Sequence, residues 1–149
     1  MQTITPVLIG VTILFAGAVI GATAMTAREK RGGFVYAQLV LMVGVYVGFA
    51  ITRLDAATVI TRGDWTALLV ESVLALGFVF AGLVALRSER PWTLGALILS
   101  HGVVDLLHLS FDASHSPAWY AFICLIYDAL VGAAAVWLLS DDKNRAEPL

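Results

Sequence analysis

Residues 6–26 read PVLIGVTILFAGAVIGATAMT, an unbroken run without a charged side chain. A helix that crosses the hydrocarbon core of a bilayer needs about 20 largely apolar residues. This stretch alone therefore predicts a transmembrane helix. Four further runs of similar length and character follow it along the chain. The five expected spans are residues 6–26, 34–52, 65–87, 92–110 and 117–140.

The composition of the whole chain is typical of a membrane protein. Of its 149 residues, 60% are hydrophobic and 13% are charged, whereas a soluble domain is about half apolar and about a quarter charged. This balance excludes a soluble enzyme, and a formal net charge of −2 leaves no basic surface for nucleic acid. We predict an all-α integral membrane protein whose single domain, residues 1–149, is one bundle of five transmembrane helices.

The basic side chains predict the orientation of this bundle. Lys and Arg concentrate in the cytoplasmic segments of membrane proteins. With the N-terminus outside and the C-terminus in the cytoplasm, only Arg53 and Arg62 fall in outer segments. The inner segments then hold the other seven basic residues, Arg28, Lys30, Arg31, Arg87, Arg90, Lys143 and Arg145. Because no transit peptide precedes the first span, we expect a multi-pass protein of a bacterial-type plasma membrane.

Two pairs of glycines suggest how the helices meet. Gly17 and Gly21 in the first span, and Gly44 and Gly48 in the second, have the Gly-x3-Gly spacing that lets two helices approach closely. The approach could be within one chain or between two. Since little of the chain lies outside the spans, we expect its partners to be membrane lipids and, through these glycine faces, a second copy or a larger membrane complex.

The polar residues inside the spans are the main functional signal. An ionisable side chain within a membrane is costly, so each is by default a functional hypothesis. The first two spans contain none, and the last three contain Glu71, His101, Asp105, His108 and Asp128. His101, Asp105 and His108 share one face of a helix because their spacing is i, i+4, i+7. At 1.5 Å per residue, all five groups fall at overlapping depths in the outer half of the bundle.

The reach of these side chains divides them into two candidate half-sites. His101 and His108 lie about 10.5 Å apart along the helix axis, too far to share one metal ion. Asp105 could join either His101 and Asp128 or His108 and Glu71. Mixed nitrogen and oxygen donors suit zinc, iron or manganese. We expect His101, Asp105 and His108 to be metal ligands, with Glu71 and Asp128 completing the shell or acting as catalytic general bases.

Other roles for the same residues stay open. Polar side chains can simply hold helices together, at about 0.6 kcal/mol per hydrogen bond, and buried acids can carry protons or bind lipid headgroups. The preferred interpretation is a metal-dependent enzyme that acts on a lipid or another hydrophobic substrate. The alternative is a non-catalytic membrane subunit, or a small transport or proton-relay component of a larger complex. Asp112 and His115, which follow the fourth span, could extend the site.

Overall fold

A computed structural model describes residues 4–56, 61–110 and 116–146. Five α-helices make up these residues, and each is long and apolar enough to cross a membrane. This confirms the all-helical architecture and the number of expected spans. The helices are α1 (Ile4–Met25), α2 (Arg28–Ala56), α3 (Arg62–Leu86), α4 (Thr93–Ser110) and α5 (Ala118–Ala146).

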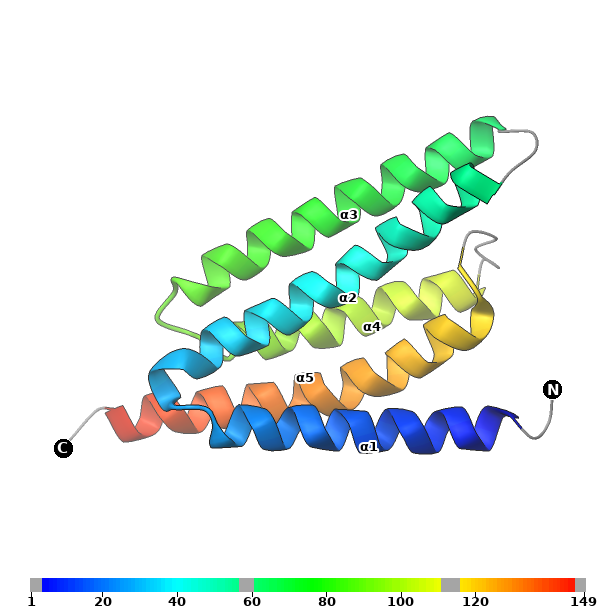
Figure 1. Cartoon of the computed structure of the whole chain (residues 1–149). Helices are drawn as coiled ribbons and strands as arrows, with labels where there is room; N and C mark the ends of the chain where they lie inside the picture. The colour runs from blue at the N-terminus through cyan, green and yellow to red at the C-terminus, as the bar shows by residue number, and fades with distance from the viewer. Residues whose placement is uncertain (1–3, 57–60, 111–115, 147–149) are drawn as a thin grey trace.

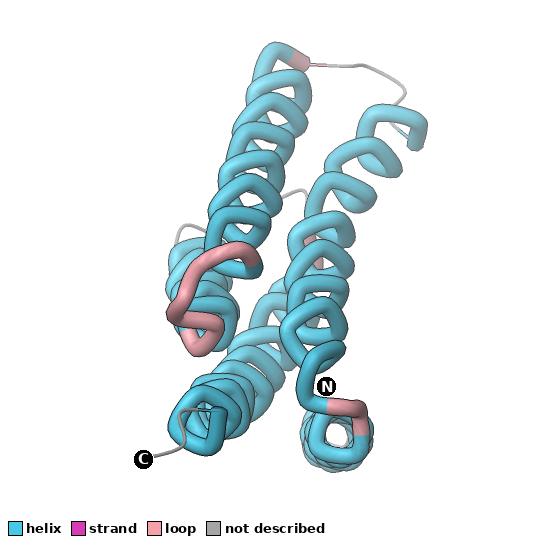
Figure 2. The backbone as a smooth tube through the Cα atoms, turned by 90° about the vertical axis from the view of Figure 1, so that its left-hand side faces the viewer, coloured by secondary structure: helices cyan, strands magenta, loops and turns pink. Residues whose placement is uncertain are grey.

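Consecutive helices run in opposite directions, so the two ends of the chain lie at opposite ends of the bundle (Figure 1). The closest pairings are α4 with α5, α3 with α2, and α1 with α5. Helices α1 and α3 therefore lie at the two edges of the bundle, with α2, α4 and α5 between them. Figure 2, seen from the end where α5 finishes, shows the described residues as helices and short loops.

The connection between α1 and α2 is shorter than the sequence suggests. The charged segment 28–33 is expected to separate two helices, but this prediction is wrong because α2 already begins at Arg28. Arg31 folds back onto the end of α1, where its Nε donates to the carbonyl of Thr26 at 3.0 Å and its Nη2 to that of Ala24 at 2.6 Å. A basic side chain that satisfies the last carbonyls of a helix stabilises its end. Charged residues therefore cap α1 while they start α2.

The connection between α2 and α3 is also shorter than the expected loop 53–64, because α2 continues to Ala56 and α3 begins at Arg62. Thr61 caps α3: its hydroxyl accepts from the backbone N–H of Asp64, and the Asp64 carboxylate accepts from the backbone N–H of Thr61. Arg53, in the last turn of α2, lies 3.3 Å from the same carboxylate. This reciprocal capping box fixes the start of α3.

Close helix contact occurs at glycines other than the expected pairs. A Cβ added to Gly95 of α4 would lie 2.4 Å from the Val136 nitrogen and 2.8 Å from the Gly132 carbonyl oxygen of α5. The backbones of α4 and α5 therefore touch at this point. In contrast, an added Cβ would meet nothing within 4 Å at the four expected positions, Gly17, Gly21, Gly44 and Gly48. Those pairs do not mediate packing within the described chain.

Candidate metal centre

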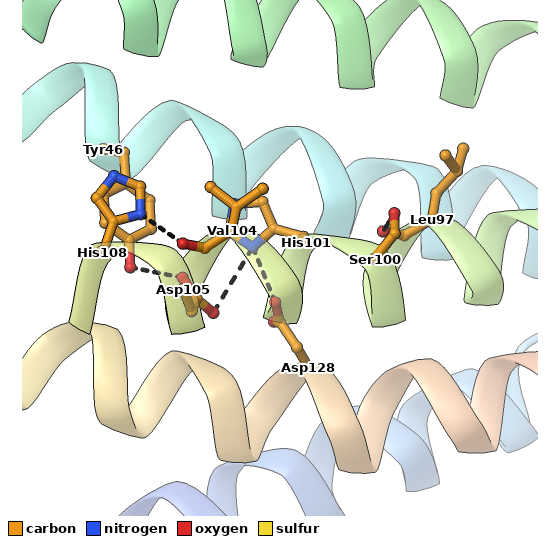
Figure 3. Close-up of polar contacts among 8 residues, drawn as sticks. All are labelled: Tyr46, Leu97, Ser100, His101, Val104, Asp105, His108 and Asp128. Atoms are coloured by element: carbon orange, nitrogen blue, oxygen red, sulfur yellow. Dashed lines mark hydrogen bonds and ion pairs between the residues drawn. The ribbon is translucent and has the colours of Figure 1, made fainter. Parts of the chain in front are cut away.

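Polar side chains within the helices fall into two groups. Hydroxyls such as those of Thr12 and Thr23 donate to a carbonyl four residues earlier in their own helix, which satisfies them locally. The ionisable side chains instead bond from one helix to another. They join α2, α3, α4 and α5, and Figure 3 shows those that come from α2, α4 and α5.

Three buried side chains from α4 and α5 converge on one point (Figure 3). Nδ1 of His101 lies 2.8 Å from Oδ2 of Asp128 and 3.8 Å from Oδ2 of Asp105. His101 is 3% exposed, and both aspartates are fully buried. One potential ligand atom from each residue lies within 4.8 Å of the others. This is the first of the two expected half-sites.

Each aspartate keeps one oxygen without a hydrogen-bond partner. Oδ2 of Asp105 and Oδ1 of Asp128 are buried and accept no hydrogen bond from the described residues. A buried polar atom left unsatisfied costs about 1–3 kcal/mol, and more when it is charged. Bound protons or a cation would remove this cost. A divalent ion in particular balances the formal charge of two carboxylates beside a neutral imidazole.

The spacing of the three groups suits such an ion. Ligand atoms about 2.1 Å from a tetrahedral zinc ion lie about 3.4 Å from one another. The two distances from His101, 2.8 Å and 3.8 Å, fall on either side of that value. Small side-chain movements would therefore open a coordination site for one ion between His101, Asp105 and Asp128.

Tyr46 of α2 joins the centre without having been expected there. Its hydroxyl donates to Oδ1 of Asp105 at 2.5 Å, so it holds the carboxylate that faces His101. Its ring stacks on His108, with ring centroids 4.4 Å apart and planes at 18°. The only signal in the sequence is a tyrosine in a largely apolar span, and tyrosines are common in helix cores. A hydrogen bond of this kind orients a metal ligand and tunes its basicity.

The second expected half-site is organised differently. Nδ1 of His108 donates to the Val104 carbonyl at 2.8 Å, and its Nε2 lies 2.8 Å from Oε1 of Glu71 on α3. The imidazole and the carboxylate share one proton, so this pair is charge-balanced without a metal. Asp105 is linked to this pair through Tyr46, whose ring stacks on His108 and whose hydroxyl donates to Asp105. Glu71 and His108 thus form a pair beside the triad.

A small cavity lies between these two groups. It has a volume of about 10 Å³ and is lined by Tyr46, Glu71, Phe78 and His101, among others. A polar cavity of this size holds about one water molecule. A single water there would connect the Glu71–His108 pair to the imidazole of His101. Asp112 and His115 lie outside the described residues.

Comparisons with protein-family models, with curated proteins and with solved structures find no match to this chain.

Proposed function

We propose that this chain is a multi-pass membrane protein that binds one divalent transition-metal ion through His101, Asp105 and Asp128. The observation that carries the proposal is a pair of buried aspartates beside one imidazole, each of which keeps one oxygen without a hydrogen-bond partner. Two carboxylates within a bundle core need a compensating charge. A nitrogen and two oxygens are donors suited to zinc, iron or manganese. His108, expected to be a ligand, becomes a neighbour of the ion in this proposal.

The proposed setting is a bacterial-type plasma membrane, with the N-terminus outside and the C-terminus in the cytoplasm. The excess of basic residues in the inner segments supports this orientation. The metal centre then lies in the outer half of the bundle. The outward-facing glycines of α1 and α2 remain the candidate surfaces for a second copy or a larger complex, since small residues favour helix contact in membranes.

The proposed activity is metal-assisted chemistry on a lipid or another hydrophobic substrate. Three protein ligands leave a fourth position open on a tetrahedral ion, as catalytic zinc sites do. An ion in that state activates water or polarises a substrate oxygen. Glu71, which lines the small cavity with His101, is placed to act as general base through one water molecule. Asp128 acts as a ligand in this scheme.

A second candidate function is ion or proton handling without catalysis. It is favoured by the small size of the cavity beside His101, about 10 Å³, which admits water but no lipid. It is also favoured by two neighbouring hydrogen bonds between ionisable groups, one between Glu71 and His108 and one between Tyr46 and Asp105. Reconstituted vesicles distinguish the two functions: flux of protons or metal ions supports this candidate, and turnover of a lipid extract supports the enzyme.

Elemental analysis of the purified full-length protein tests the metal site itself. We expect about one zinc, iron or manganese ion per wild-type chain and loss of that ion in Asp105→Asn and in Asp128→Asn, which keep the size of each side chain. Glu71→Gln is the matched control, because it removes a buried carboxylate outside the triad, and it should retain the ion. Helicity and elution volume report whether each variant is folded. A wild-type protein that takes up no ion after dialysis against all three metals would refute the proposal.

A further inference from the structure

A groove opens on the side of the bundle opposite α3, between α1, α2 and α5. Its volume is about 320 Å³, at the lower end of the range for small-molecule sites. Helices α1 and α2 are joined by a tight turn and then diverge, while α1 stays against α5 (Figure 1). Residues on the rim, Val11, Phe15 and Leu41, are each more than half exposed. In a bilayer the groove would therefore open sideways into the hydrocarbon.

One polar group in this groove has an unused hydrogen-bonding capacity. Gln38 of α2 lines the groove, and its Oε1 accepts from the hydroxyl of Tyr127 at 3.1 Å. Its amide nitrogen has no hydrogen-bond partner among the described residues. Hydrocarbon supplies no water to replace that partner, so an amide there needs one from the protein or from a ligand. The groove therefore offers a hydrogen-bond donor to whatever occupies it.

The depth of this donor restricts the occupant. At 1.5 Å per residue, Phe15, Gln38 and Tyr127 each lie within about 6 Å of the centre of their span. The ester groups of a phospholipid lie at the membrane interface, about 15 Å from the centre of a 30 Å core. A phospholipid would therefore present only methylene groups to Gln38. The occupant must carry an uncharged hydrogen-bond acceptor deep in the membrane.

Aromatic side chains line the groove beside Gln38. The rings of Phe15 and Tyr127 are stacked, with centroids 5.7 Å apart and planes at 25°. Aromatic side chains in such an arrangement favour a planar ring as a partner, in offset or edge-on contact. A planar ring with a carbonyl group and an apolar tail meets all three requirements of the groove: its depth, its donor and its aromatic wall.

We propose that the groove binds a lipid-soluble quinone. The ring lies against Phe15 and Tyr127, one carbonyl accepts a hydrogen bond from the Gln38 amide, and the isoprenoid tail leaves between α1 and α2 into the bilayer. The site is separate from the metal ligands, so the proposal does not depend on a bound ion. The two are nevertheless neighbours, because Tyr120 lines the groove and its ring contacts that of Tyr46 with centroids 5.6 Å apart.

Equilibrium binding of a radiolabelled benzoquinone with a ten-carbon chain tests this site. The full-length protein is held in nanodiscs of phosphatidylcholine, and partition into empty nanodiscs is subtracted. We expect one saturable site per chain. Gln38→Leu should weaken binding about tenfold, because it removes one hydrogen bond from a site without water. Leu41→Phe should weaken binding because the larger side chain narrows the groove. Leu69→Phe is the matched control: Leu69 is on α3 and is exposed to the same 64% as Leu41, and its variant should bind normally.

The outcomes separate this proposal from the metal site. Saturable binding that falls in Gln38→Leu and Leu41→Phe but not in Leu69→Phe supports the quinone site. Absence of saturable binding, or equal binding by wild type and Gln38→Leu, overturns it. Displacement of the quinone by a saturated fatty acid as readily as by unlabelled quinone overturns the ligand class. Metal content is measured on the same samples and should be unchanged in Gln38→Leu.

Discussion

A methyl group added at Gly95 should drive α4 and α5 apart. The new Cβ would lie 2.4 Å from the Val136 nitrogen, whereas ordinary contact begins at 3.4 Å, so the helices must separate by about 1 Å (3.4 − 2.4). Backbone atoms of Val136 and Gly132 cannot rotate away as a flexible side chain could. Overpacking of this kind costs about 1–3 kcal/mol. We therefore expect Gly95→Ala to lower the free energy of unfolding by about that amount.

The same movement should damage the metal centre. His101 lies on α4 two turns after Gly95, and its Nδ1 is 2.8 Å from Oδ2 of Asp128 on α5. A displacement of about 1 Å takes that pair beyond the spacing of about 3.4 Å that separates two ligand atoms of one zinc ion. Gly95→Ala should therefore weaken metal binding although Gly95 touches none of the three ligands.

Unfolding in mixed detergent micelles, titrated with a denaturing detergent, measures the change in stability. Gly17→Ala is the matched control, because its new Cβ would meet nothing within 4 Å. It should be neutral or stabilising by up to about 1 kcal/mol, since alanine is the better helix former. The two identical substitutions thus have opposite expected signs. A Gly95→Ala protein as stable as Gly17→Ala, with unchanged metal affinity, would refute the close approach of α4 and α5.

Three further predictions follow from individual contacts. Tyr46→Phe removes the hydrogen bond to Asp105. Its metal affinity, measured by competition with a coloured chelator, should fall 10–100-fold, because hydrogen bonds to metal ligands contribute about this much to affinity. Removal of the ion should lower the unfolding free energy of wild type by about 2.7 kcal/mol relative to protein with free metal at 100 times Kd, and Asp105→Asn should not respond. Thr61→Ala breaks the cap of α3 and should cost about 1 kcal/mol in a thermal melt, whereas Thr66→Ala, whose hydroxyl bonds only within its helix, should cost less.

The number and type of the helices could be predicted because composition alone decides them. Long apolar runs must form helices in a membrane, where every backbone group needs an internal partner. The helix boundaries were harder to predict, because the charged segment 28–33 resembles a loop between two helices. Its charges do not end a helix when one of them, Arg31, bonds back to the preceding helix. Whether a charged side chain caps or interrupts a helix depends on the three-dimensional path of the chain.

The sequence predicts which residues form the candidate site better than it predicts the contacts between them. Helical spacing places His101 beside Asp105, and matched depth brings Asp128 to them. The sequence could not show that His108 would bond to Glu71 and lie outside the triad, since that depends on the ring of Tyr46 lying against His108. Nor could it separate outward-facing glycines from packed ones, because the Gly-x3-Gly pattern is the same on either face of a helix.

The glycines of α4 and α5 and the acids of the metal centre are best understood as one unit. An aspartate side chain is short, so Asp128 of α5 can reach His101 and Asp105 of α4 only if the two helices are close. Helices with larger side chains at the contact lie about 8–10 Å apart. Gly95 and Gly132 bring the backbones together, and a Cβ at Gly102, beside His101, would lie only 3.4 Å from Cβ of Asp128. The small residues that tighten this helix pair therefore set the distance at which its carboxylates can share an ion.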